Sequence, residues 1–429
     1  MISKKHFVIW CLLATFVSGS PKIEAGISLQ AKRDFDSILN PLIADRRLPG
    51  YYVAVFKNGQ KEFEQSEGLA DEKNRVAPDG MTLYAIESMT EPLTAAAIML
   101  LVESGQLSLD EPLSKYLPEF EAMKVAVNGS LSSGLIPARQ QITIRHLISH
   151  SSGLTEAKRF SSNMTEVQNL YRQEGLFRRN SSLGSLADHV KALAKIPLVF
   201  HPGARKAESI SYDVLARVVE VVTGESFPEF LSEAVLKPLA MGDTHFIVPE
   251  AKRARVAAMY EPVVWGYNVP GKPKMYRASV LSTNNSAFSK KKPNLFIGGS
   301  SGLMSTGDDY AKFLSFLLGS NGNTDLILSL PSREVILRGF RNTNQDLTLV
   351  TKEIASRESP QSDSPEPGFA ASDEKLSTFS YKNSRFNTSF WIDMETRIAG
   401  VFMTQLSPLQ FELAPALKEA ANRNFSSNQ

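Results

Sequence analysis

The stretch Tyr84-Ala85-Ile86-Glu87-Ser88-Met89-Thr90-Glu91-Pro92-Leu93-Thr94 places one serine directly before a long apolar run. Residues 88–104 are apolar on nearly every side of a helix, which predicts a buried helix beginning at Ser88. Glu91 follows Ser88 by three residues, and residues three apart lie on the same helix face. The stretch therefore predicts a serine and a carboxylate side by side in the first turn of a buried helix.

Two hairpins are predicted, one near each end of the chain. Residues 51–56 and 61–68 are typical of strands, and Asn58-Gly59 between them is a strong type I′ turn signal. Residues 386–393 and 397–405 predict the second hairpin. Two amphipathic helices flank these hairpins, at residues 29–46 and 409–421.

A helix and hairpin at the start, and a hairpin and helix at the end, predict one domain that is split in sequence. We expect an α+β fold: an antiparallel sheet flanked by helices, built from both chain ends, with a helical lobe inserted between them. The predicted domain covers residues 26–429. Its parts are an α/β lobe at about 29–87 and 295–422, a helical lobe at about 88–294, and a mobile loop at 351–378 that is rich in Ser, Pro, Glu and Asp.

Shorter elements are expected inside this frame. A tight Gly/Ser turn is predicted at 298–302, and residues 265–297 are basic with few apolar side chains, which is typical of a surface loop. The clearest further helices are predicted at residues 142–147, 185–194, 214–222 and 308–318.

The N-terminus has the pattern of a signal peptide. Lys4 and Lys5 are followed by an apolar stretch over residues 7–17 that is too short to span a bilayer, and small residues follow it. We expect residues 1–19 to be removed, with cleavage after Ala25 or an uncleaved anchor as alternatives. The expected location is secreted or periplasmic, with no stable membrane insertion after cleavage.

Charge and cysteine content exclude several functions. Removal of residues 1–19 takes away two of the 47 basic residues and none of the 45 acidic ones, which leaves equal numbers of each. A neutral chain has no electrostatic footprint for nucleic acid. The single cysteine, Cys11, lies in the predicted signal, so thiol chemistry and cysteine metal sites are not expected. The sequence contains no phosphate loop or dinucleotide fingerprint, and we expect no cofactor.

Several ordered motifs resemble one family, the serine β-lactamases and penicillin-binding proteins. The Ser88 segment is similar to the family's S-x-x-K motif. Residues 142–154 (ITIRHLISHSSGL), 213–220 (DVLARVVE), 237–244 (KPLAMGDT) and 301–306 (SGLMST) are similar to further family segments. Within the family the resemblance is strongest to class C β-lactamases and family VIII esterases, and it covers roughly residues 30–420.

This resemblance implies a site with three parts. The family uses a serine at a helix N-terminus as nucleophile and a lysine one turn later to handle its proton. A tyrosine from the helical lobe works with that lysine. A third strand supplies His, Lys or Trp followed by glycine, and a backbone N–H for the oxyanion.

This chain keeps the serine, but each of the three motifs otherwise departs from the family pattern. Glu91 stands in place of the lysine, and Glu208 in place of the tyrosine. Lys382 occupies the position of the third motif, followed by Asn383 and Ser384 where the family has glycines. We expect Glu91 and Glu208 to face each other near Ser88 in a partly buried pocket, where like charges would raise the proton affinity of one of them.

Three interpretations of these residues remain open at this point. Ser88 is a vestige or a live nucleophile with Glu91 or Glu208 as base. Glu91 and Glu208 form a metal or cationic-ligand site, or they pair with Lys382, Lys206 or Arg385 in a dead pocket. His146 and His150 are four residues apart, which is a zinc spacing that lacks a nearby acidic third ligand.

The sequence favours a catalytically impaired or inactive serine hydrolase homologue that acts by binding, and it favours a non-enzyme over an enzyme. The expected partner is an unidentified ligand of ester, β-lactam or peptide-like chemistry. The alternative is an active esterase or β-lactamase-like hydrolase. A protein that binds cell wall or acts as a scaffold through its outer surface is a third, weaker hypothesis.

Overall fold

The computed structural model of the chain describes residues 22–157, 164–177, 184–262, 276–278, 297–320, 327–339, 379–382, 386–407 and 413–426. The predicted signal peptide, the predicted loop at 351–378 and most of residues 265–297 lie outside this part of the chain. Within it, none of the helices is both long enough and apolar enough to cross a membrane.

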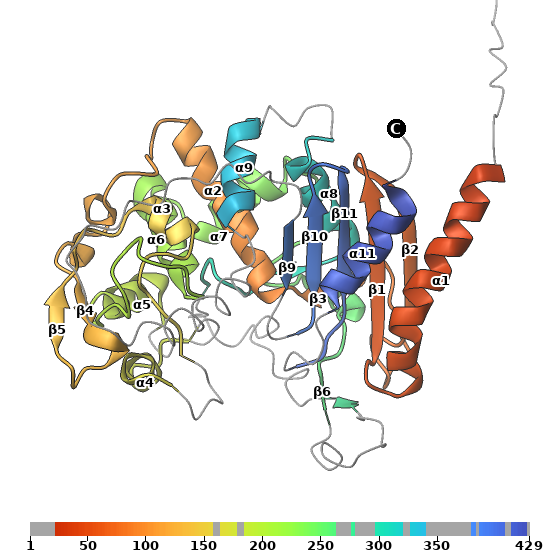
Figure 1. Ribbon diagram of the computed structural model, residues 1–429, viewed down its shortest axis with the longest axis horizontal. Helices are drawn as coiled ribbons and strands as arrows, with labels where there is room; N and C mark the ends of the chain where they lie inside the picture. The colour runs from red at the N-terminus through yellow and green to blue at the C-terminus, as the bar shows by residue number, and fades with distance from the viewer. Residues whose placement is uncertain are drawn as a thin grey trace, which may run out of the picture.

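A five-stranded antiparallel sheet forms the centre of the fold, and both ends of the chain contribute to it. The strand order is β2-β1-β11-β10-β9 (Figure 1). The strands are β1 (Gly50–Lys57), β2 (Gln60–Gly68), β9 (Phe379–Lys382), β10 (Ser389–Asp393) and β11 (Ile398–Met403). Val53 pairs with Phe402, so the first and last hairpins join directly in the predicted α+β arrangement.

The first hairpin turns as its sequence predicts. Asn58 has φ 49° and Gly59 has φ 78°, and a type I′ turn requires positive φ at both central residues. Asparagine and glycine tolerate this conformation better than other residues. The turn sets the register in which β1 pairs with β2.

The sheet is covered on both faces, which explains why β1 has no charged residue before Lys57. Tyr51, Val53 and Val55 face a core formed with α1 (Lys22–Ala44) and α11 (Ala414–Phe425). Tyr52 and Ala54 face the opposite core, which includes α2 (Thr90–Glu103) and α8 (Gly307–Leu317). Figure 1 shows α1 and α11 on one side of the sheet and the helical lobe on the other side.

The helical lobe follows the predicted pattern, with small shifts at helix ends. The side chains of Thr143 and Ser185 cap the helices that follow them, and Gly224 ends α6 at φ 74°. A short hairpin, β4 with β5, was not predicted. The elements of this lobe are β4 (Lys124–Ala126), β5 (Leu135–Pro137), α3 (Ile144–Ile148), α4 (Glu166–Gln173), α5 (Leu186–Leu193), α6 (Ser211–Thr223), α7 (Phe227–Leu231) and a π-helical turn η5 (Ser232–Leu236).

The remaining elements are short. They are β3 (Tyr84–Ala85), β6 (Tyr260–Pro262), β7 (Tyr276–Ala278), β8 (Met304–Ser305), α9 (Leu330–Gly339) and the 3₁₀ turns η1 (Glu87–Met89), η2 (Leu113–Lys115), η3 (Pro118–Phe120), η4 (Val127–Gly129) and η6 (Glu250–Arg255).

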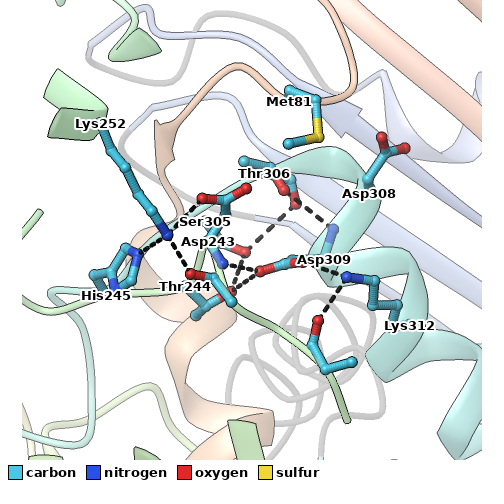
Figure 2. Close-up of polar contacts among 12 residues, drawn as sticks. Met81, Asp243, Thr244, His245, Lys252, Ser305, Thr306, Asp308, Asp309 and Lys312 are labelled. Atoms are coloured by element: carbon cyan, nitrogen blue, oxygen red, sulfur yellow. Dashed lines mark hydrogen bonds and ion pairs between the residues drawn. The ribbon is translucent and has the colours of Figure 1, made fainter. Parts of the chain in front are cut away.

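A charged network fastens the end of the helical lobe to α8 (Figure 2). Asp309 is 3% exposed. Its carboxylate accepts a 2.6 Å hydrogen bond from the backbone N–H of Asp243 and forms a 2.7 Å ion pair with Lys312. The Asp243 carboxylate in turn pairs with Lys252 at 2.9 Å and with Arg255. Residues 240–245 are thereby held in place by side chains from two neighbouring elements.

Candidate functional site

Ser88 lies in the 3₁₀ turn η1, directly before α2, and is 3% exposed. The turn is fixed from the sheet side, because β3 pairs with β8 and the Ile86 N–H donates to the Leu303 carbonyl at 3.0 Å. Glu87, the residue before the serine, has φ 47°, a backbone conformation that costs a non-glycine residue about 1–2 kcal/mol. Strain of this kind persists where the surrounding structure enforces it, and it is frequent at functional sites.

Glu91 lies in the first turn of α2 and is 1% exposed. A carboxylate is favoured at this end of a helix, because the N-terminal end carries partial positive charge. The Glu91 Oε2 atom lies 3.3 Å from Nε2 of His150. The prediction that a carboxylate follows Ser88 in the first turn of a buried helix is confirmed, and its imidazole partner is new.

His150 is buried and lies just beyond the end of α3, with φ 54°. Its second ring nitrogen, Nδ1, lies 3.4 Å from the hydroxyl of Ser209. That hydroxyl is 2.7 Å from the hydroxyl of Ser211, which is 2.8 Å from that of Ser152. The imidazole therefore lies between the Glu91 carboxylate and a chain of three buried serine hydroxyls.

Two buried tyrosines flank Glu91, and both phenols donate to backbone carbonyls. Tyr212 donates to Ile148 at 2.8 Å, and Tyr310 donates to Met89 at 3.0 Å. Burial, and after it the negative charge of Glu91, raise the pKa of Tyr212 well above its usual value. The same two causes raise the pKa of the Tyr310 phenol well above its usual value. Neither phenol is therefore suited to act as a base near neutral pH.

Glu208 does not share the environment of Glu91. It lies three residues before α6 and is exposed, whereas Glu91 is buried. The predicted partly buried position is therefore wrong for Glu208, whereas the facing of the two carboxylates near Ser88 stays a prediction. Ser209, beside Glu208, is buried and lies against His150.

The third predicted position is placed only by its backbone. Lys382 is the last residue of β9 and pairs with Ser389 of β10 at the edge of the sheet. Asn383, Ser384 and Arg385 lie outside the described residues.

His146 and His150, which are four residues apart, make different contacts. His146 belongs to the capping box of α3: its Nδ1 accepts from the Thr143 N–H at 3.2 Å, and its own N–H donates to Thr143 Oγ1. His150 lies after the helix has ended, so the two rings do not share a helix face. Among the residues that the structure describes, no group of three His, Cys, Asp or Glu side chains could hold a metal ion.

Comparison with known proteins identifies the family and the fold of this chain. The family model for Beta-lactamase matches residues 35–422. The chain belongs to the beta-lactamase family. The matched range includes Ser88 and Glu91, and the correspondence of this segment to the S-x-x-K motif stays a prediction from the sequence.

Relatives within the beta-lactamase family include an esterase. Esterase EstB of Burkholderia gladioli is 30% identical over 292 residues, which is 67% of this chain and 70% of EstB. Protein Rv1367c of Mycobacterium tuberculosis (strain ATCC 25618 / H37Rv) is 32% identical over 271 residues, which is 62% of this chain and 61% of that protein. The aligned part thus spans about three fifths of the mycobacterial protein.

Solved structures share the beta-lactamase-type fold over nearly the whole chain. EstCE1, described as a hydrolase with promiscuous acyltransferase activity, matches with a TM-score of 0.65 at 20% identity, covering 93% of this chain and 99% of its own. Simvastatin synthase (LovD) from Aspergillus terreus, in its unliganded selenomethionyl form, matches with a TM-score of 0.67 at 19% identity, covering 94% and 98%. A penicillin-binding protein homologue from Pyrococcus abyssi also matches, with a TM-score of 0.54.

These findings establish a serine hydrolase family with esterase and acyltransferase neighbours. The structure adds that Glu91, three residues after Ser88, is a buried carboxylate paired with His150. Sequence patterns could not have predicted this pairing. His150 lies in a segment that matches the family pattern, and nothing in that segment signals a contact with residue 91.

Proposed function

We propose that this protein is a secreted or periplasmic member of the beta-lactamase family that has lost efficient acyl transfer and acts by binding a ligand at the Ser88 site. One observation carries the proposal. Glu91, at the position of the family's lysine, is 1% exposed and lies 3.3 Å from His150. A buried carboxylate that pairs with a buried imidazole has a structural role in the core, and we propose that this is the role of Glu91.

The chemical argument concerns the charge beside the serine. In acyl transfer an oxyanion develops on the substrate, and the family's lysine and oxyanion hole stabilise negative charge there. A carboxylate at the lysine position opposes that charge. Loss of one proton-transferring group typically costs about 10²–10⁴ in rate.

The two buried tyrosines beside Glu91 do not replace the lost base. The raised pKa values of Tyr212 and Tyr310 keep both phenols protonated, and each phenol already donates to a carbonyl. Glu208 is exposed, so it does not share the buried environment of Glu91. The proposal therefore favours a binding site over an active hydrolase that uses Glu91 or Glu208 as base.

The relatives support acyl compounds as the ligand class. They include an esterase and a hydrolase with promiscuous acyltransferase activity, and the substrates of esterases and acyltransferases contain an acyl carbonyl. We propose that the ligand of this protein has ester, amide or β-lactam chemistry and remains intact when bound.

The test combines covalent labelling, turnover and binding. The mature protein is incubated with a fluorescent penicillin, a fluorophosphonate probe and short p-nitrophenyl esters, beside its Ser88→Ala variant and an active family VIII esterase. We expect no Ser88-dependent labelling and no Ser88-dependent turnover, but a rise in melting temperature with members of an ester, amide and lactam panel. Labelling or turnover that disappears in Ser88→Ala would show an active hydrolase instead.

A further inference from the structure

We infer that the N-terminal cap of α3 is sensitive to acid: protonation of His146 removes the acceptor that closes the cap and loosens the segment that carries His150. The inference concerns a conformational device of the fold, and it does not depend on whether the candidate site binds a ligand. It starts from a capping box in which histidine stands where such boxes usually have glutamate or glutamine.

The cap of α3 uses the lone pair of an imidazole nitrogen. The Thr143 hydroxyl accepts from the His146 N–H at 3.3 Å, and His146 Nδ1 accepts from the Thr143 N–H at 3.2 Å. A backbone N–H donates and does not accept, so Nδ1 carries no proton in this arrangement and the neutral ring has its proton on Nε2. A protonated imidazole has an N–H at both positions and cannot accept. One proton therefore breaks this half of the box.

The same chain contains a cap of this kind that does not titrate, at α4. There the Thr165 hydroxyl accepts from the Gln168 N–H at 3.2 Å, and the Gln168 side chain accepts from the Thr165 N–H at 3.1 Å. The amide oxygen of glutamine stays an acceptor throughout the pH range in which histidine titrates. The two boxes differ in the side chain that closes them, and the one at α3 responds to protons.

The surroundings of His146 favour its neutral ring. In the described part of the chain, the charged groups that act on it are Arg145, on α3 itself, and Asp110, in the turn before η2. Burial, and after it the charge of Arg145, lower the pKa of His146 from its usual value of 6.5, and Asp110 opposes them. Beside Nε2 lie groups without charge: a Cβ atom built on Gly203 would be 3.1 Å from Nε2 of His146 and 2.9 Å from Nε2 of Gln140. The N-terminal end of a helix also disfavours a cation.

The lowered pKa of His146 sets the direction of the pH effect. The unfolded chain binds the proton at the usual pKa, and the folded chain binds it less readily. The contribution of the cap to stability is therefore fully present above about pH 6.5 and is lost as pH falls toward the lowered pKa of the folded chain. Carboxylates, with ordinary pKa values of about 4, titrate mostly below this window.

The cap is connected to the candidate site through the backbone of α3. The His146 carbonyl accepts from the Ser151 N–H at 2.8 Å, and the Leu147 carbonyl accepts from the His150 N–H at 3.2 Å. These bonds hold His150 at φ 54°, where its Nε2 lies 3.3 Å from the Glu91 carboxylate. Because α3 has five residues, its first turn and the turn that holds His150 share residues. Loosening of the cap therefore reaches His150 directly.

Hydrogen exchange followed by mass spectrometry tests the inference on the full chain. The unaltered protein is compared with His146→Gln, which completes the type of box found at α4, at about pH 7.5 and at about pH 5. Both proteins are measured under identical conditions, so the intrinsic exchange rate at each pH cancels. At the higher pH, peptides over 142–152 should exchange equally in both. At the lower pH they should exchange about fivefold faster in the unaltered protein, which is the usual effect of a lost N-cap.

Two controls separate the cap from other effects of acid. Peptides over α4 should exchange equally in both proteins at both pH values. His201→Gln removes another histidine whose Nδ1 accepts from a backbone N–H, that of Arg139 at 3.3 Å, but outside a helix cap. This variant should keep the acid-dependent loosening of 142–152. Should His146→Gln fail to fold, His146→Glu takes its place, because glutamate completes the same box and titrates below this window.

Three outcomes would count against the inference. Equal exchange of 142–152 in the unaltered protein and His146→Gln at the lower pH would overturn it. A difference of the same size at both pH values would also overturn it, because the ring would then have a structural role that protonation does not change. Loss of the acid response in His201→Gln would overturn the assignment to His146.

Discussion

The imidazole Nε2 of His150 lies 3.3 Å from the carboxylate of Glu91, and this contact joins the first turn of α2 to the segment after α3. Both side chains are buried, so the pair links two parts of the core rather than two surface groups. His150→Ala should lower the free energy of unfolding by about 2–3 kcal/mol, because it removes the imidazole that faces a buried carboxylate. Urea denaturation measures this change.

A double-mutant cycle separates the free energy of the Glu91–His150 contact from the free energy of the other packing that is lost with the imidazole. His150 also packs against the Tyr212 ring, with 5.1 Å between ring centroids, and that contact is lost in either background. In a Glu91→Gln protein, His150→Ala should therefore cost about 1 kcal/mol less than in the unaltered protein. Equal costs in both backgrounds would mean that the contact with Glu91 contributes nothing measurable to stability.

Restoring the family's lysine should not restore catalysis. Glu91→Lys places an ammonium beside His150 and at the positive end of α2, where cations are disfavoured. We expect a less stable protein and no gain in p-nitrophenyl ester turnover, since Glu208 and the segment after Lys382 still depart from the family pattern. Glu91→Gln is the control of matched size without the added charge. Turnover in Glu91→Lys alone would show that those other departures are harmless.

The network around Asp243 makes stability depend on acid pH. Hydrogen bonding to Arg255, and then to Lys252, lowers the pKa of Asp243 to about 2 from 3.8, against the opposing effect of burial. A lowered carboxylate pKa means that the unfolded chain binds the proton more readily. Its contribution is therefore fully present above about pH 4 and is lost as pH falls toward 2.

The size of this effect follows from the shift. The Asp243 side chain is 14% exposed, and nearly two pKa units correspond to about 2 kcal/mol. Asp243→Asn should remove that amount at pH 7 and much less at pH 2, as measured by urea denaturation at a series of pH values. Glu233→Gln, at an exposed ion pair with Lys237, is the control and should change stability by less than about 0.5 kcal/mol at any pH. A pH-independent loss in Asp243→Asn would contradict the assigned pKa.

Local sequence signals predicted those parts of the fold that depend on neighbouring residues. The Asn58-Gly59 turn was found because it is decided by two residues and their backbone preferences. The joining of the first and last hairpins was predicted from the order of elements. The hairpin of β4 and β5 was missed, because its strands have three residues each and a long connection at 127–134 separates them.

The site was predicted in part, and the missing part is tertiary. Ser88 ends up directly before α2 and Glu91 in its first turn, and this placement follows from the local sequence. His150 approaches from a segment 59 residues further along the chain, and Glu208 points outward although Ser209 beside it points inward. Such choices depend on how helices pack, and no periodic pattern encodes them.

Ala240 has φ 54°, although it stands where the family segment resembling residues 237–244 has glycine. This conformation costs an alanine about 1–2 kcal/mol, and glycine adopts it without that cost. Glycine also has more conformational entropy than alanine in the unfolded chain, which lowers the free energy of unfolding by about 0.4–1 kcal/mol. Because Ala240 is exposed, its methyl group contributes little packing. Ala240→Gly should therefore raise the free energy of unfolding by about 0.5–1 kcal/mol.

An alanine-to-glycine substitution within a helix should lower the free energy of unfolding, and it therefore serves as the control. Ala416 is exposed and lies within α11, where glycine is less favourable than alanine by about 0.5–1 kcal/mol. Urea denaturation of the two variants under identical conditions should move their midpoints in opposite directions. If Ala240→Gly destabilised the protein as Ala416→Gly does, the left-handed conformation at residue 240 would be wrong. The Lys312 contact to the Ala240 carbonyl would then need a different backbone geometry.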